Sequence, residues 1–239
     1  MQEGDAPHAG RLDQWYAVVR EAKRIAPDDD CREAVAALVA AVERLAPLAA
    51  ATNDASVQRG HVAPALASWM ALCSAAGVDS VEAMIWGKYP RLCPHCLAFP
   101  HDTRTCTGRT AGIETLDWPA LSRIAASTAG SRPATLAGWQ RMFAQIYDPP
   151  ARATAVARLA EELQELVDAI ERKGPASRRF RNEASDVLAW IMQLQNALDR
   201  DSGIADVDTP CSLERAIAAA LAPSHEVSED VAPSASRRR

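Results

Sequence analysis

The sequence predicts an all-α protein, and three observations carry that prediction. Aromatic residues make up 5% of the 239 residues. Alanine is abundant and runs of β-branched residues are almost absent, which favours helix over sheet. Apolar residues also recur at intervals of three and four through most of the chain, the spacing of helices with one buried face. A chain of this length can bury a substantial core, as one large domain or two small ones.

Helix boundaries follow from capping and breaking residues. Pro27 and the three aspartates after it end one helix and offer a cap for the next, and Gly77 ends another. The expected helices span about 12–25, 32–45, 62–76, 81–86, 136–147, 153–172 and 177–200. A short helix near 212–221 precedes a tail over 223–239, whose Ser, Pro and Glu content predicts disorder.

Charge and hydropathy exclude some classes of protein. The formal net charge is −5, which gives no general affinity for nucleic acid. No apolar run reaches the roughly 18 residues that a membrane-spanning helix needs. The segment from Met1 to Gly10 is polar and acidic, unlike a signal peptide. We therefore expect a cytoplasmic protein with no membrane partner.

The chain contains an internal repeat of helical segments. Pairs of segments and residues share a nearly constant offset: 36–45 with 157–166, 66–72 with 188–194, Trp15 with Trp139, and Pro27 with Pro149. Apolar positions stay in register across the aligned segments. Alanine-rich helices can match by chance, but one offset across several helices favours duplication of a helical module.

The cysteines indicate a metal site between the two copies. Cys93, Cys96, His101 and Cys106 supply three thiolates and one imidazole, the ligand set of tetrahedral Zn²⁺ in closed structural sites. The spacing is similar to a zinc knuckle, and His95 is the weaker candidate ligand. Because the remaining cysteines are scattered, a metal site in a reducing compartment is favoured over a disulfide framework.

Two roles are open for this zinc segment. Knuckles can grip single-stranded nucleic acid through basic and aromatic neighbours, here Phe99 with Arg91, Arg104 and Arg109. The acidic chain makes nucleic acid a less favoured partner. A structural clip that fixes the two helical modules relative to each other is the favoured role, because an irregular linker would otherwise be floppy.

Carboxylates gather in the two helices of the second copy. They are Glu161, Glu162, Glu165, Glu183 and Asp186. Like charges three or four residues apart on a helix repel one another, and Glu183 falls on an apolar stripe where an unpaired charge is costly. Protons, basic side chains or a metal must neutralise them, and Mg²⁺ prefers such oxygen ligands. The alternative for Glu161, Glu162 and Glu165 is an ordinary solvated acidic face.

The first copy has lost these acids. The corresponding positions are held by Ala40, Ala41, Arg44, His61 and Pro64. None of these residues is an oxygen ligand for a hard cation. Only the second copy is therefore expected to bind Mg²⁺.

The acid pattern resembles the signature of the MazG-like all-α nucleoside triphosphate pyrophosphohydrolases, relatives of the dimeric dUTPases. In this chain it reads Glu161-Glu162-x-x-Glu165, a spacer of 17 residues, then Glu183-x-x-Asp186. The resemblance covers Trp139 to about Leu198. It implies hydrolysis of a nucleoside triphosphate between the α- and β-phosphates, giving a monophosphate and pyrophosphate, with house-cleaning of the nucleotide pool as a family-level role.

The resemblance also implies residue roles. Glu162, Glu165, Glu183 and Asp186 would hold Mg²⁺, and Glu161 would orient or deprotonate the attacking water. Asn196 would donate a hydrogen bond to the substrate, unless it is a helix-surface or capping residue. The remaining candidates lie in the loop between the acidic helices, where cations can meet phosphates, or on the preceding helix, where Trp139 and Gln140 would contact a base unless Trp139 is core. The loop cations are Lys173, Arg178, Arg179 and Arg181.

These observations predict a tandem architecture. A degenerate MazG-like module (1–87) and a zinc-knuckle-like linker (88–112) precede an intact catalytic module (113–204), with a short helix and tail over 205–239. Because the family pairs protomers, the two copies are expected to pair within one chain as a pseudo-dimer, with a homodimer as the alternative. Two other functions stay open: a non-catalytic nucleic-acid-binding or regulatory protein, and hydrolysis of another pyrophosphate-containing nucleotide.

Overall fold

The computed structural model describes residues 11–24, 31–50, 55–104, 106, 116–202 and 217, without the side chains of 55–61. Within these residues the secondary structure is entirely helical, which confirms the all-α prediction. The helices are α1 (Leu12–Ala22), α2 (Cys31–Glu43), η1 (Ala46–Ala49), α3 (Ala55–Ala75), α4 (Val81–Lys88), α5 (Trp118–Ser127), η3 (Ala129–Ser131), α6 (Leu136–Ile146), α7 (Arg152–Lys173) and α8 (Arg178–Asp201). None of them is long and apolar enough to cross a membrane.

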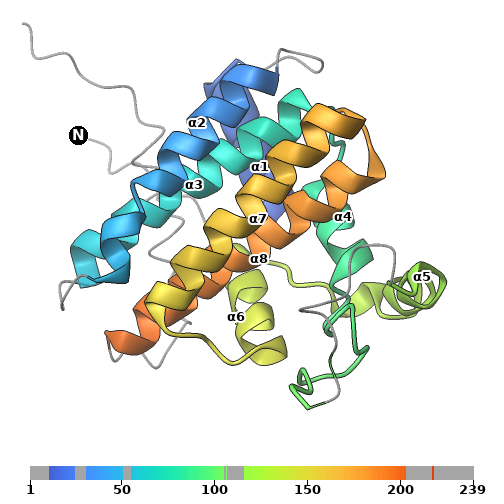
Figure 1. The fold of residues 1–239 in the computed structure, drawn as a ribbon. Helices are drawn as coiled ribbons and strands as arrows, with labels where there is room; N and C mark the ends of the chain where they lie inside the picture. The colour runs from blue at the N-terminus through green and yellow to red at the C-terminus, as the bar shows by residue number, and fades with distance from the viewer. Residues whose placement is uncertain are drawn as a thin grey trace, which may run out of the picture.

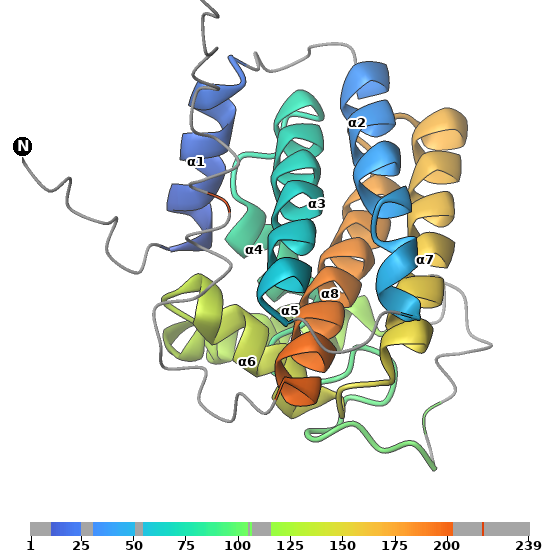
Figure 2. The same cartoon turned by 90° about the vertical axis from the view of Figure 1, so that its left-hand side faces the viewer.

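Four long helices form the centre of the molecule (Figure 1). α2 and α3 pack together as one pair and α7 and α8 as another, and the pairs meet through α3 on α8 and α2 on α7. Figure 2 shows α3 and α8 side by side, with α1 on one flank and α7 on the other. α1 packs on α3, and α6 packs on α8. Each half therefore has a shorter helix, α1 or α6, packed against the second member of its own pair.

This order of contacts supports the predicted repeat. Trp15 of α1 and Trp139 of α6 are both buried, and neither indole N–H has a hydrogen-bond partner within the described residues. The aligned segments 66–72 and 188–194 lie on α3 and α8, which pack against each other. The duplication itself stays a proposal.

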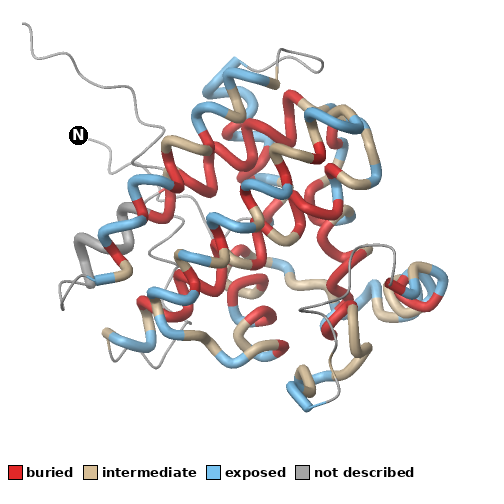
Figure 3. The backbone as a smooth tube through the Cα atoms, viewed as in Figure 1, coloured by how far each residue is buried: buried red, intermediate tan, exposed pale blue. Residues whose placement is uncertain are grey.

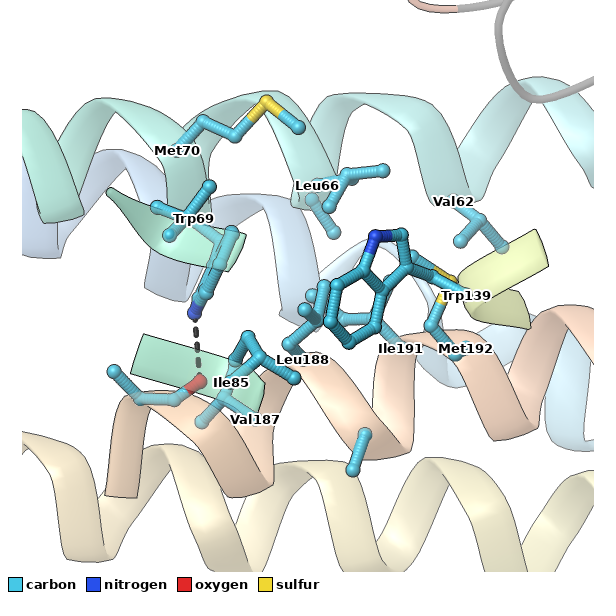
Figure 4. Close-up of a cluster of buried hydrophobic side chains, with 14 of the residues drawn as sticks. Val62, Leu66, Trp69, Met70, Ile85, Trp139, Val187, Leu188, Ile191 and Met192 are labelled. Carbon is cyan, nitrogen blue, oxygen red and sulfur yellow. Dashed lines mark hydrogen bonds between the residues drawn. The ribbon is translucent and has the colours of Figure 1, made fainter. Parts of the chain in front are cut away.

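One continuous hydrophobic core joins the two halves. The buried faces of the long helices turn toward each other, as Figure 3 shows. In the close-up of Figure 4, Trp139 of α6 lies among Leu66 of α3 and Leu188 and Ile191 of α8. A hydrogen bond also links the halves, because the indole N–H of Trp69 donates to the Ala184 carbonyl at 2.8 Å.

The structure departs from the expected helices in two places. α3 begins at Ala55 rather than near Val62, and it accommodates Pro64 in its interior. α5 was not expected, although its start carries a recognisable signal. The Asp117 side chain accepts a hydrogen bond from the backbone N–H of Ala120 at 2.9 Å, and proline lies in the first turn. The expected helix near 212–221, apart from Ile217, and the tail lie outside the described residues.

Candidate active site and metal centres

The acidic residues of α7 and α8 meet because a tight turn joins the two helices. Gly174 ends α7 with φ +80°, a conformation that favours glycine. The Ser177 side chain then caps α8 by accepting from the Phe180 N–H at 3.1 Å. This turn sets the last half of α7 beside the first half of α8, which is where the candidate ligands lie.

Three carboxylates converge at this place. One oxygen each from Glu162, Glu165 and Glu183 lies within 4.8 Å of the other two. Glu165 is exposed, Glu162 is half-buried and Glu183 is buried, so the group opens to solvent on one side. Octahedral Mg²⁺ binds oxygens at about 2.1 Å, which leaves neighbouring ligands about 3 Å apart. The three oxygens thus fit a divalent cation with small side-chain movements.

Their environment favours either a proton or a cation. Burial, followed by Asp186 and Glu165, raises the pKa of Glu162 to about 8. Burial and Asp186 likewise raise the pKa of Glu183 to about 7. Arg179 offsets part of this repulsion, with its Nε 3.6 Å from a Glu183 oxygen. At neutral pH the site therefore keeps protons on part of its carboxylates, and a bound cation would take the place of those protons.

Asp186, also predicted as a Mg²⁺ ligand, is not among the three carboxylates that meet within 4.8 Å, and the other half of the chain holds it. Lys88, the last residue of α4, places its Nζ 2.5 Å from each Asp186 carboxylate oxygen. The Lys88 Nζ also donates to the Asn182 carbonyl at 3.3 Å, and the Tyr89 hydroxyl donates to Asp186 Oδ1. Sequence reasoning missed Lys88 and Tyr89, because no local pattern reports a contact between residues this far apart in the chain.

Glu161 does not join the three converging carboxylates. Its side chain is 56% exposed and forms an ion pair with Arg158 one turn earlier on α7. To accept a proton from a water bound at the site, Glu161 would have to leave Arg158. Its role in activating water stays a prediction.

The predicted substrate residues occupy two kinds of place. Lys173, Arg178 and Arg181 are exposed around the turn between α7 and α8, where a phosphate can reach them. The Arg178 guanidinium carbon lies 4.1 Å from the centroid of the Trp118 ring of α5, a cation–π distance. These cations stay candidates for phosphate contacts.

Asn196, Gln140 and Trp139 are buried instead. The Asn196 amide donates to the Gln140 carbonyl and to the Gln193 side chain, both at 3.1 Å. The Gln140 amide donates to Asp199 at 2.8 Å. Trp139 is fully enclosed, so the structure favours its reading as a core residue over base stacking. The hydrogen bonds of Asn196 and Gln140 tie α6 to α8, and contacts of these residues with a substrate stay predictions.

The cysteine segment forms a compact group between α4 and α5. One ligand atom each from Cys93, Cys96, His101 and Cys106 lies within 4.8 Å of the other three, and His95 is not among them. The Cys93 and Cys106 sulfurs are 3.9 Å apart, and the Cys96 sulfur is 3.6 Å from the His101 Nδ1. Tetrahedral Zn²⁺ with Zn–S of about 2.3 Å and Zn–N of about 2.05 Å sets these separations at about 3.8 and 3.6 Å.

Local hydrogen bonds shape this segment for metal binding. The Leu97 N–H donates to the Cys93 carbonyl at 2.9 Å and the Cys93 N–H to the Ala98 carbonyl at 3.1 Å, which closes a turn around the first two cysteines. Burial opposes ionisation of Cys96, but hydrogen bonds from the Asp102 and Ala98 backbone and from the Cys93 and Cys106 side chains together lower the pKa of the thiol. A thiolate is the form that binds zinc.

The same segment is anchored to the second half of the chain. The His101 N–H donates to the Ile146 carbonyl at the end of α6 at 2.8 Å, and the His101 and Tyr147 rings lie 5.1 Å apart. Phe99 is 50% exposed, with the Arg91 guanidinium 5.8 Å from its ring centroid. A role in nucleic-acid binding stays a prediction, and Arg109 lies outside the described residues.

The fold and the site together define the class of protein. It is an all-α bundle that has a carboxylate site suited to a divalent cation and a Cys₃His group suited to zinc. A family model, that of the MazG nucleotide pyrophosphohydrolase domain, matches residues 151–212 of this chain. The match covers all the acids of the site, and the resemblance drawn from the sequence is confirmed for this part of the chain. No curated protein and no solved structure matches the chain.

Proposed function

We propose that the protein is a Mg²⁺-dependent nucleoside triphosphate pyrophosphohydrolase. The observation that carries this proposal is the convergence of Glu162, Glu165 and Glu183 within 4.8 Å, inside the segment that matches the MazG domain. Carboxylates so placed repel one another unless a cation joins them, and hydrolysis of a triphosphate needs a cation that is shared between enzyme and phosphates.

Each acid has a part in the proposed reaction. Glu162, Glu165, Glu183 and Asp186 would hold Mg²⁺. When bound, Mg²⁺ would offset the negative charge of the triphosphate and lower the pKa of a water molecule. Glu161, released from Arg158, would accept the proton of that water. A bond then forms between the water oxygen and phosphorus while the bridging bond between the α- and β-phosphates breaks, giving a nucleoside monophosphate and pyrophosphate.

The exposed cations at the turn between α7 and α8 suit the phosphate chain. Lys173, Arg178 and Arg181 are exposed at this turn, and one guanidinium group can bind two phosphate oxygens at once. The buried Asn196, Gln140 and Trp139 are not assigned to the substrate in this proposal. Their contacts keep α6 against α8 and so hold the acid-bearing helix in place.

The first half of the chain would act as a degenerate partner of the second. In this proposal the pairs α2–α3 and α7–α8 take the places of two protomers, so that one chain forms a pseudo-dimer. The packing of α3 on α8 and of α2 on α7 supports it. So does the loss of acids from the first copy, where Ala41 and Arg44 stand at the positions of Glu162 and Glu165.

The Cys₃His segment would hold a structural Zn²⁺ that clips the two modules together. The sulfur and nitrogen separations of 3.9 and 3.6 Å support zinc. The segment begins directly after Lys88 and Tyr89, which contact α8, and its far side contacts the end of α6. It therefore continues from α4 of the first module and, through His101, contacts the end of α6 in the second module.

The test of the proposed reaction is the identity of its products. Purified full-length protein is incubated with Mg²⁺ and a panel of ribonucleoside and deoxyribonucleoside triphosphates, and the products are separated by ion-exchange chromatography. We expect monophosphate and pyrophosphate in equal amounts from at least one substrate. Diphosphate with inorganic phosphate, or no product from any nucleotide, would refute the proposal.

A further inference from the structure

Lys88 and Tyr89 are unusual among the residues around the carboxylates. Both are contributed by the first half of the chain, and both are buried, with Lys88 2% and Tyr89 5% exposed. A lysine is almost never buried to this extent unless it is paired. Packing alone does not require an ammonium group here, because an apolar side chain of similar length would fill the same space without the cost of desolvating a charge.

The contacts of Lys88 direct two of its three donors to Asp186 and the third to Asn182. Its Nζ donates to both Asp186 oxygens at 2.5 Å and to the Asn182 carbonyl at 3.3 Å. The Tyr89 hydroxyl adds a second donor on Asp186 Oδ1. Donors on both oxygens fix the position and the plane of this carboxylate. Without them, the aspartate side chain could rotate and the direction of its oxygens would vary.

These contacts leave room for a cation on the same carboxylate. An ionised carboxylate accepts about four hydrogen bonds or ligands. Lys88 and Tyr89 occupy two positions on Oδ1, and Lys88 occupies one on Oδ2. One acceptor position therefore stays open on Oδ2, which is enough for a single bond to a metal.

Tyr89 is itself held in place. Its ring packs edge-on against Phe143 of α6, with centroids 5.3 Å apart and planes at 73°, a favourable aromatic geometry. The Lys88 Nζ lies 5.5 Å from the centroid of the same ring. The two residues thus form one rigid unit at the end of α4, the helix that packs against α8.

We infer that Lys88 and Tyr89 are positioning residues of the hydrolase site, supplied from the end of α4 where the degenerate module meets the zinc segment, which act through Asp186 by fixing its carboxylate for the divalent cation. The inference rests on the proposed function. It gives the first half of the chain a part in the site, although that half has lost its own acids. Neither residue is expected to touch the substrate.

Tyr89→Phe is the cleanest probe, because it removes one hydroxyl, preserves the ring against Phe143 and changes no charge. Mn²⁺ affinity of the zinc-loaded protein is measured by electron paramagnetic resonance, without nucleotide. We expect Tyr89→Phe to weaken Mn²⁺ binding about tenfold, as loss of a group that orients a metal ligand does. The matched control is Tyr16→Phe, since the Tyr16 hydroxyl is also buried and donates to the Val78 carbonyl at 2.6 Å, away from the carboxylates.

Tyr16→Phe should bind Mn²⁺ as the unchanged protein does. If Tyr89→Phe also binds Mn²⁺ with unchanged affinity, or if both variants lose affinity equally, the positioning role is refuted. A thermal melt of each variant accompanies the titration, so that a general loss of folding is recognised by its effect on both.

Lys88→Met provides a second, independent variant. Removal of the ammonium also removes a positive charge that repels the divalent cation, so the Mn²⁺ affinity of this variant would reflect two opposite effects. The variant is therefore judged by its kcat and KM. A positioning residue affects kcat, whereas a residue that binds the phosphates in the ground state affects KM. We expect kcat to fall about 10- to 100-fold, with KM for the nucleotide within about threefold. A raised KM with unchanged kcat would show a direct phosphate contact and would overturn the inference.

The two proposals fail in different ways. If the protein releases no pyrophosphate from any nucleotide, the hydrolase proposal fails. The Mn²⁺ titration of Tyr89→Phe would still show whether Tyr89 positions the Asp186 carboxylate for a cation. If the protein hydrolyses nucleotides while Tyr89→Phe binds Mn²⁺ normally, the hydrolase proposal stands and the positioning role alone is refuted.

Discussion

At the scale of single residues, the carboxylates on α7 and α8 affect stability and metal binding in opposite directions. Glu183 is 3% exposed, and its pKa is raised to about 7 by burial and by Asp186. Ionised Glu183 therefore destabilises the metal-free fold, and the same charge attracts a divalent cation. A functional site of this kind is expected to cost stability until its ligand is bound.

Glu183→Gln separates the two effects. Without Mg²⁺ at pH 8, the neutral amide removes a buried charge, so the variant should be more stable than the unchanged protein by about 2 kcal/mol. With Mg²⁺ present, the unchanged protein should gain stability and the variant should not. Urea denaturation in both conditions measures this. A variant that is less stable in the absence of Mg²⁺ would contradict the account.

The raised pKa values also predict a dependence of stability on pH. Glu162 and Glu183 bind protons more tightly in the folded than in the unfolded state, since their pKa values rise from 4.5 to about 8 and about 7. Stability is therefore greatest below the unfolded pKa and is lost as pH rises through the folded values. Melting temperatures in Mg²⁺-free buffer should fall between pH 5 and about 9, and Mg²⁺ should bind more tightly over the same interval. A melting temperature that rises between pH 5 and about 9 would be inconsistent with buried carboxylates whose pKa values are raised.

At the scale of the elements, the zinc segment connects the two halves near the carboxylates. It follows α4 directly, and Lys88 and Tyr89 are the last residues before it begins. Its fold is defined by short turns and by the contact of His101 with the end of α6. Without a metal, a segment with so little regular structure has few contacts that would hold it in place.

A pair of histidine variants tests this metal centre. His101→Gln removes a ligand and should lower the bound zinc well below one equivalent. His95→Gln alters the neighbouring histidine that lies outside the ligand group and should retain about one equivalent. Elemental analysis of both purified proteins gives the result. Equal zinc content in the two variants would refute the assignment of His101.

Sequence reasoning succeeded where the signal is local. The helical period predicted α1, α2, α6, α7 and α8 nearly to their ends, and a three-residue spacing placed Glu162 and Glu165 on one face of α7. It placed the start of α3 too late, because the polar residues before Val62 carry no apolar period. It also missed the capping signal of α5.

At the scale of the whole molecule, the contacts that complete the site are not local. Lys88 and Tyr89 reach Asp186 across the interface between the halves, and no spacing in the sequence reports that contact. The loss of acids from the first copy predicted that it does not bind Mg²⁺ itself, and it left open which of its residues lie near the site. The structure brings the end of α4 to the carboxylates, which a comparison of aligned positions cannot reveal.

The intrachain pairing predicts the oligomeric state. Because α3 and α8 already bury each other within one chain, no second chain is needed to cover them. The protein should be a monomer of 25.7 kDa at micromolar concentration, as measured by size-exclusion chromatography with light scattering. A stable dimer would contradict the pseudo-dimer proposal.

The central claim is that the acids of the second module hydrolyse nucleotides, and a matched pair of variants on the best substrate tests it. Asp186→Asn should lower kcat/KM about 100-fold or more, since it removes a negatively charged metal ligand. Asp168→Asn, an acid on α7 that pairs with Arg172 away from the site, should leave kcat/KM within about twofold. Rates of pyrophosphate release that are equal in the two variants would contradict the account.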